Sequence, residues 1–408
     1  MSLNANEVQI LRDLANEYAG FASLPEQKVK REMWIRHNSL LPERPLVLVD
    51  QLPWNELDVD GSLVLKITDD YWRSVERWLR QEIYKWKHFP CDMVLDEYIK
   101  LSRPLQNSGW GLDAEVKRLY TDDTNDVASQ EITNLIRDME DVEKIHPPRI
   151  TLDSNREKEI YETGKEIFKG ILPVRMTGAI MHLGAWDTIA YWMGVEACYI
   201  ELMDRPEMMH AIMEKMVEGY LSQIDDLNHL GAFDAFGHYC HCSHTYRADD
   251  KEETFTRSEN SWAFGLAQLF TSVSPRITQE FECEYMKRVF PHFGHIYYGC
   301  CDRLDDRLDL IVTLPNVRKI SCSPWSDRDV FADRLPREFI MSNKPSPAFL
   351  ATGSLDEDAI RRDLRRTVDA AKRNDIKLEL ILKDVSTVRY EPARLTRFYE
   401  IAMEEVNR

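Results

Sequence analysis

The last two-thirds of the chain alternate between strand-like and helix-like segments, and this alternation constrains the fold more than any other feature. Apolar side chains recur at helical spacing in 155–169, 205–229, 275–290 and 392–406. The segments between them are typical of strands, and lie at 172–180, 231–237, 295–300, 317–323, 338–342 and 377–384. Such an order predicts an α/β fold whose parallel sheet is connected by crossover helices.

Two architectures satisfy this order, a closed barrel and a doubly wound open sheet. The glycine-rich fingerprint of dinucleotide-binding sheets, G-x-G-x-x-G after a strand, does not occur in the chain. We therefore predict a (β/α)8 TIM barrel.

Residues 1–150 have a less regular pattern, with helix-like runs at 5–18 and 70–88 and short apolar strands near 46–50 and 63–67. Consecutive prolines in IHPPRI (145–150) block a helix and favour extended backbone, as expected of a joint. We predict two parts: a mainly helical N-terminal extension or cap at 1–150, which contributes partly to the barrel, and the barrel itself at 151–408.

Composition excludes several classes of function. The chain has 408 residues and a formal net charge of −18, so its surface repels nucleic acid and anionic membranes. It contains neither an apolar stretch of about 20 residues nor a recognisable signal peptide. Eight cysteines in such a chain do not indicate a disulfide framework, so we expect the protein to be located in the cytoplasm, where thiols stay reduced. The oligomeric state stays open, with a homodimer as one possible assembly.

Polar and aromatic residues follow most of the expected strands, at the ends where barrel enzymes place their catalytic groups. In chain order they are His182, Trp186, His238, Cys240, Tyr298, Cys300, Cys301, Asp302, Trp325, Lys344, Lys383, Asp384 and Arg389. Their common placement is the main functional signal in the sequence.

The segment HYCHCSH (238–244) is rich in residues that bind metals, since zinc prefers thiolate and imidazole ligands. If it is the end of a strand, alternate residues share a face, and His238, Cys240 and Cys242 converge. The alternative is a loop in which the thiols pack as small apolar groups.

Cys300 and Cys301 are adjacent, so on a continuing strand they would face opposite sides. If the strand ends before them, both can bind one metal. Packing, or a nucleophilic thiolate with His238 or His244 as its base, are the alternatives.

Lys383 and Asp384 end an apolar strand, where an unpaired buried charge is costly. They either close a structural ion-pair network with Lys344 and Asp302 or act in catalysis. The aromatic rings of Tyr298, Trp186 and Trp325 either line a substrate pocket or pack in the barrel.

The chain also resembles the uroporphyrinogen decarboxylase superfamily. The resemblance covers roughly 155–405, and rests on GVEACYIELMDRPEMMHAIMEKM (194–216), on TSVSPRITQEFECEYMKRVF (271–290) and on HIYYGCCDRL (295–304), where that superfamily has His-x-Cys-Gly after a strand. It implies a (β/α)8 barrel. The arginine motif with which the decarboxylases grip substrate carboxylates is absent here, so the chain is more similar to the zinc-dependent methyltransferases that exchange methyl groups with corrinoid proteins or thiols.

In that branch a His-x-Cys strand and a later cysteine bind zinc. Here Tyr298 stands in place of the histidine, Cys300 keeps the cysteine, and Lys383–Asp384 replace the usual Gly-Cys. A zinc site would therefore be rebuilt from Cys300 and Cys301 with His238 or Cys240, or with Asp384.

We expect an enzyme that moves a methyl group between a small methylated donor, a corrinoid protein and a thiol. Tyr298, Trp186, Trp325, His182 and Arg389 would bind the substrate. Lys383, Asp384, Lys344 and Asp302 would act in catalysis. One alternative is a metal-free carboxy-lyase, in which Lys344, Lys383 and Arg389 hold a carboxylate and Asp384 or Asp302 handles the proton. Another is a non-catalytic barrel that binds a tetrapyrrole or corrinoid.

Overall fold

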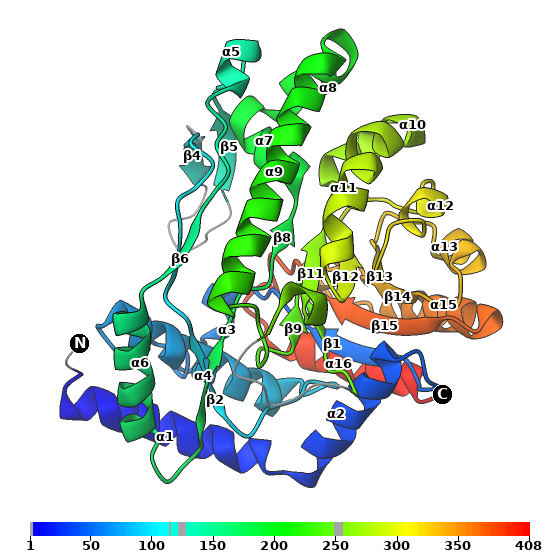
Figure 1. Ribbon diagram of the computed structural model, residues 1–408. Coiled ribbons are helices and arrows are strands. Elements are labelled where there is room, and N and C mark those ends of the chain that lie inside the picture. Colours follow the sequence, from blue (N-terminus) through cyan, green and yellow to red (C-terminus); the bar gives the residue numbers. More distant parts are fainter. Residues whose placement is uncertain (1–2, 114–115, 121–127, 249–255) are drawn as a thin grey trace.

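Seven parallel strands form the main sheet of the computed structural model, which describes residues 3–113, 116–120, 128–248 and 256–408 (Figure 1). In spatial order they are β1 (Leu46–Val49), β15 (Lys377–Leu382), β14 (Ile340–Asn343), β13 (Val317–Cys322), β12 (His295–Tyr298), β11 (Trp262–Gly265) and β8 (His182–Leu183). β1 comes from the N-terminal third of the chain, yet it pairs in parallel with the last strand. The predicted parallel sheet is confirmed.

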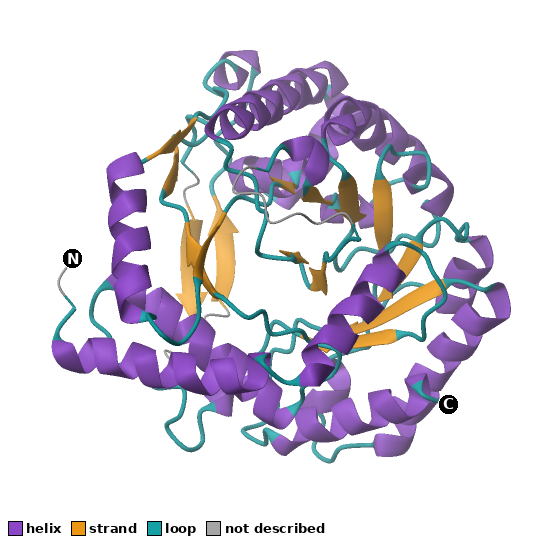
Figure 2. Cartoon of the chain, turned by 60° about the horizontal axis from the view of Figure 1, so that its bottom comes forward, coloured by secondary structure: helices purple, strands orange, loops and turns teal. Residues whose placement is uncertain are grey.

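Shorter pairings continue the arrangement beyond this sheet. β2 (Ile99–Ser102) pairs in parallel with β7 (Val174–Thr177), and a single bridge joins Ala179 to Phe233. β3 (Leu105–Asn107) pairs antiparallel with β6 (Ile150–Leu152), and β4 (Val116–Tyr120) with β5 (Ala128–Ile132). The strands and their helices form a ring (Figure 2). This arrangement is compatible with a TIM barrel. Among the described residues, however, no continuous ladder of strand pairings closes the ring, so a closed (β/α)8 barrel remains a prediction.

The longer helices surround the sheet and agree with the apolar periodicity of the sequence. They are α1 (Ala5–Ala22), α2 (Pro25–Asn38), α4 (Asp70–His88), α6 (Ser154–Ile167), α7 (Ala185–Met193), α8 (Val195–Asp204), α9 (Pro206–Leu230), α15 (Glu357–Asn374) and α16 (Ala393–Val406). Shorter ones are α3 (Trp54–Leu57), α5 (Met139–Val142), α10 (Pro275–Thr278), α11 (Glu284–Val289), α12 (Leu308–Ile311), α13 (Arg328–Arg334) and α14 (Ala348–Ala351), and a π-helical turn (Gln279–Cys283) joins α10 to α11. No helix in the described part of the chain is long and apolar enough to cross a bilayer.

The two faces of the sheet bury different sets of side chains. On one face Val47, Leu380 and Leu382 pack with residues of α15 and α16. On the opposite face, Tyr297 and Ile381 belong to a second apolar cluster. Because side chains alternate along a strand, Lys319, Ser342, Glu379 and Lys383 share this second face. This face carries the groups of the candidate site.

Two expected strands differ from the structure. Residues 63–67 are irregular, because Lys66 and Ile67 donate their backbone N–H groups to the Glu76 carboxylate instead of to a neighbouring strand. In 231–237 only Phe233 makes a bridge, because Asp234 accepts the N–H groups of Phe236 and Gly237 and turns the chain.

Candidate thiol and metal site

Cys300 and Cys301 lie just after β12, and both thiols point to the same place. Gly299 ends the strand with a φ of 87°, a left-handed conformation that favours glycine. A Cβ at this position would lie 2.6 Å from Leu304 Cδ1. Asp302 Oδ1 then accepts the N–H of Cys300 at 2.7 Å. Because the strand has ended, the alternation of faces no longer applies, and the two sulfurs lie 3.5 Å apart.

The carboxyl end of β15 brings the charged groups to these thiols. Lys383 Nζ donates to Cys300 Sγ at 3.0 Å, and Cys301 Sγ lies 2.8 Å from Asp384 Oδ2. Lys383 Nζ also lies 3.1 Å from Asp384 Oδ2. The Lys383 side chain is 1% exposed, whereas that of Asp384 is 45% exposed, so the cluster opens to solvent on the Asp384 side.

Cys300, Cys301 and Asp384 form a potential metal site. One donor atom from each lies within 4.8 Å of the others, and within the described ranges no other group of three such residues meets this criterion. Two thiolates on a tetrahedral zinc, with Zn–S bonds of about 2.3 Å, lie roughly 3.8 Å apart, which is close to the separation seen here. The donor set therefore fits zinc. The Lys383 ammonium contacts two of the same donors, so it competes with a metal for them.

His238 and Cys240, expected as ligands, lie outside this group because HYCHCSH is a hairpin and not a strand end. β9 (Tyr239–Cys240) pairs antiparallel with β10 (Ser243–His244), and His241 and Cys242 form the turn. The hairpin lies inside the ring of strands (Figure 2). Cys240 is fully buried, and the His238 ring stacks on Tyr246 at a centroid distance of 4.5 Å.

The hairpin turn brings His241 to the thiol site. His241 Nε2 lies 3.2 Å from Lys383 Nζ, and the imidazole ring stacks on Phe264 at 3.9 Å with an interplanar angle of 10°. The sequence pattern predicts a strand end here, and such a prediction does not single out His241. The adjacent Cys242 lies 3.7 Å from the hydroxyl of Tyr297.

A buried ion pair anchors the hairpin to the sheet. Lys319 Nζ contacts Glu379 Oε2 at 2.8 Å and donates to Ser243 Oγ at 2.6 Å. Ser243 in turn donates to Glu379 Oε2 at 2.8 Å. Both ionic side chains are fully buried, so this polar network fixes the hairpin within an otherwise apolar interior.

The surroundings of Cys300 favour its thiolate. The pKa of Cys300 is lowered by the hydrogen bond from Cys301, then by one from His241 and by the Lys383 charge, against the effect of burial. The same thiol–thiolate hydrogen bond raises the pKa of Cys301. Burial lowers the pKa of Lys383, but the thiolate charges outweigh it and keep the pKa above its usual value. Of the two thiols, Cys300 is therefore the one whose thiolate is favoured.

Lys344 belongs to a separate polar group beside the hairpin. Its ammonium donates to Ser342 Oγ at 2.6 Å and to the Tyr297 hydroxyl, which lies 2.6 Å from the same Ser342 oxygen. Lys344 is 2% exposed. The structure therefore joins Lys344 to Tyr297 and Cys242, and no described contact links it to Asp302.

Asp302 lies near two further carboxyl groups, those of Asp187 and Glu282. Burial, followed by the charges of Asp302 and Cys300, raises the pKa of Asp187 to about 6. Glu282, in the π-helical turn, is fully buried, and its pKa is raised by burial. Tyr298 donates to Glu282 Oε1 at 3.4 Å and is 1% exposed, so its ring faces the carboxyl groups and not the thiols.

The remaining expected substrate-binding residues are scattered. Trp186 is fully buried; its indole donates to Phe281 O and its ring packs on Phe270. Trp325 is 75% exposed. Arg389 is exposed on the loop after β15. His182 stacks on Phe264, the ring that also packs on His241, so it alone of the four connects to the thiol site by contacts. Their roles in binding substrate stay predictions.

The fold and the site define an α/β protein with a mostly parallel sheet and a thiol pair at the carboxyl ends of its strands. No known protein-family model and no curated protein sequence matches the chain. Among solved structures, a methyltransferase from Methanosarcina mazei is similar, with a TM-score of 0.55 and 11% sequence identity. The alignment covers 92% of this chain and 98% of that one. At such identity the likeness shows a shared fold, and membership of the uroporphyrinogen decarboxylase superfamily remains a prediction.

Proposed function

We propose that the protein is a methyltransferase-like enzyme whose reaction takes place at Cys300, Cys301 and Asp384. The observation that carries the proposal is the convergence of these three donors from two strand ends. The full-length likeness to a protein named as a methyltransferase supports the same class. The methyl donor would be a small methylated molecule, and the acceptor a thiol or the corrinoid of a partner protein.

Zinc is the metal that fits two thiols and a carboxylate, and when bound it would hold a thiol as thiolate at neutral pH. The chain's own residues prepare the site for that chemistry. Lys383 and His241 hold negative charge at Cys300, and Asp384 lies against the sulfur of Cys301. A substrate would reach the site from the side of Asp384, which is partly exposed.

The metal-free carboxy-lyase receives less support. That hypothesis requires Lys344, Lys383 and Arg389 to grip one carboxylate, but Lys344 is buried on Tyr297 and Ser342 while Arg389 is exposed. The alternative of a non-catalytic tetrapyrrole or corrinoid carrier remains as an outcome of the test.

The test is a methyl-transfer screen with purified protein. Methylated amines, thiols and methoxylated compounds are offered with cob(I)alamin, and methylcobalamin formation is followed by its absorbance. We expect turnover with one donor class and at least a hundredfold loss in Cys300→Ser. Cys198→Ala, a buried thiol in α8, serves as the matched control and should retain activity. Release of carbon dioxide instead, or retention of a bound pigment without turnover, would contradict methyl transfer.

A further inference from the structure

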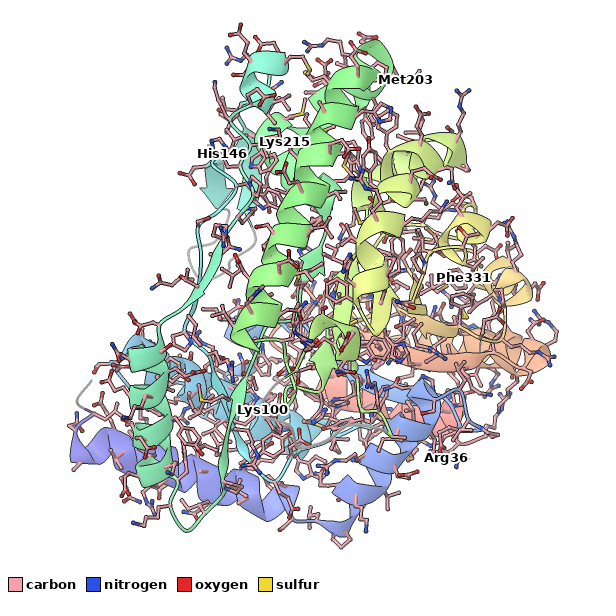
Figure 3. The ribbon with its side chains drawn as sticks, in the orientation of Figure 1. Arg36, Lys100, His146, Met203, Lys215 and Phe331 are labelled. Carbon is pink, nitrogen blue, oxygen red and sulfur yellow. The ribbon has the colours of Figure 1, made fainter. Side chains whose placement is uncertain are left out.

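Cys300 and Cys301 are adjacent in the chain, and their surroundings set them apart from its other thiols. All eight cysteines are free and lie in the described ranges, and Cys301 alone is partly exposed. Figure 3 shows how densely side chains fill the space between the strands and the surrounding helices, as at Phe331 of α13, and the other seven thiols are buried in such packing. An oxidant from solvent therefore reaches this pair before any other cysteine.

The contacts of the pair match those of thiols that peroxides oxidise reversibly. The Lys383 ammonium lies 3.0 Å from the sulfur of Cys300, and a neighbouring positive charge favours the thiolate, which is the nucleophilic form of a cysteine. The sulfur of Cys301 lies 3.5 Å from that of Cys300. Once oxidised, Cys300 therefore has a second thiol in contact with it, which is the arrangement of redox-sensing cysteines.

A disulfide between the two residues requires little movement but is not an ordinary cross-link. The sulfurs are already in contact, and rotation of the partly exposed Cys301 side chain can bring them within bonding distance without opening the apolar interior. Adjacent Cα atoms lie about 3.8 Å apart, below the separation of about 4.4–6.8 Å that disulfides usually span. Strained disulfides are reduced more easily than structural ones, so a bond at this position is suited to form and break as a switch.

We propose that peroxides join Cys300 and Cys301 in a reversible disulfide that disables the thiol site. The Cys300 thiolate attacks one oxygen of hydrogen peroxide, so an S–O bond forms, the O–O bond breaks, and the hydroxide that leaves takes a proton from solvent. The sulfur of Cys301 then attacks that of Cys300, the S–O bond breaks, and the hydroxide leaves as water with the proton of Cys301. The pair is oxidised by two electrons, and the peroxide is reduced to two molecules of water.

The disulfide removes two of the three donors that Cys300, Cys301 and Asp384 offer to a metal, because thiolates are the sulfur ligands of zinc. Oxidation therefore prevents metal binding and the chemistry that depends on it. The loss of methyl transfer on oxidation rests on the proposed function, whereas formation of the disulfide rests on the thiol pair alone. A thiol reductant reverses the bond and restores the donors.

The experiment is treatment of the metal-depleted full chain with hydrogen peroxide, followed by mass spectrometry of the intact protein and of its peptides. We expect the protein to lose two hydrogen atoms, with the new bond in the peptide that holds Cys300 and Cys301, and dithiothreitol to return the original mass. In Cys301→Ser the bond cannot form, and dimedone should trap the sulfenic acid of Cys300. In Cys300→Ser the oxidation of Cys301 should be at least tenfold slower.

Cys198→Ala, which removes a buried thiol of α8, is the matched control and should be oxidised like the unmodified protein. Thiols that stay reduced, addition of oxygen without loss of hydrogen, or a disulfide that still forms in Cys301→Ser would overturn the proposal. Methyl transfer is assayed separately, before and after oxidation. A disulfide in protein that transfers no methyl group when reduced would contradict the proposed function and support the redox chemistry, whereas turnover that persists in fully oxidised protein would overturn the regulation.

Discussion

The ammonium nitrogen of Lys383 lies 3.0 Å from the sulfur of Cys300, although their strands, β15 and β12, are separated in the sheet by β14 and β13. This contact across the ring draws the thiol pair, the carboxylate of Asp384 and the imidazole of His241 into one cluster. The charge balance of the cluster leads to the first prediction.

Lys383→Met should reduce the reactivity of Cys300 in metal-depleted protein. Methionine is of similar length but carries no charge, so the pKa of Cys300 rises toward its ordinary value. Alkylation of Cys300 by iodoacetamide, measured by mass spectrometry, should be nearly independent of pH between 6 and 9 in the unmodified protein. In Lys383→Met the rate should be about tenfold lower at pH 6 and should increase with pH. Lys165→Met, at an exposed pair with Glu162, should leave the profile unchanged.

Glu379→Gln should destabilise the fold, because it leaves the Lys319 charge buried without its partner. Breaking a buried ion pair on one side costs about 3–5 kcal/mol in free energy of unfolding. Replacing both residues together, as Lys319→Met with Glu379→Met, should recover much of this loss. Urea denaturation measures the free energy of unfolding of the single and the double variant. Glu162→Gln, on the surface, should change the free energy by less than about 0.5 kcal/mol.

The same pair predicts a pH dependence. Burial raises the pKa of Glu379, but the charge of Lys319 and the hydrogen bond from His37 outweigh it and leave the pKa below its ordinary value. The ionised carboxylate thus contributes stability above the unfolded-state pKa, and this contribution is lost as pH falls below about 4. Equal urea midpoints for Glu379→Gln and the unmodified protein at pH 7 would contradict the anchoring role of the pair.

Asp187→Asn should stabilise the protein at pH 8 and have no effect at pH 4. The folded-state pKa of Asp187 is raised to about 6 by burial and by Asp302 and Cys300, so ionisation opposes folding. Stability is lost as pH rises through that value, and asparagine avoids the loss. With allowance for partial exposure, we expect a gain of about 1–2 kcal/mol at pH 8. Thermal unfolding at several pH values measures this gain, with the exposed Asp204→Asn as the control. A gain of equal size at pH 4 and pH 8 would be inconsistent with titration of Asp187.

The strand ends of the thiol site were predictable from sequence. HIYYGCC and LELILKD each place polar groups directly after a run of apolar residues, and parallel strands bring such ends to one edge. Sequence also left open whether Cys300 and Cys301 face together. The answer depends on the backbone of Gly299, whose left-handed φ ends the strand at Tyr298, two residues before the predicted end.

The hairpin was not predictable, because its strands have two residues each and carry no periodicity. Its position depends on Lys319 and Glu379, which are 76 and 136 positions from Ser243 in the chain. The positions of the Trp186 and Trp325 side chains were not predictable either, because they also depend on the packing of the fold. Both follow strands, but Trp186 is on the inward side of α7, while Trp325 protrudes from a turn.

Metal analysis of the purified protein, combined with zinc X-ray absorption, tests the central claim most directly. We predict about one zinc per chain, with two sulfur ligands in its coordination shell, lost in Cys300→Ser and in Cys301→Ser but retained in Cys198→Ala. A folded protein that binds no zinc when it is supplied, or zinc that persists unchanged in Cys300→Ser, would contradict the assignment of these thiols as the reaction centre.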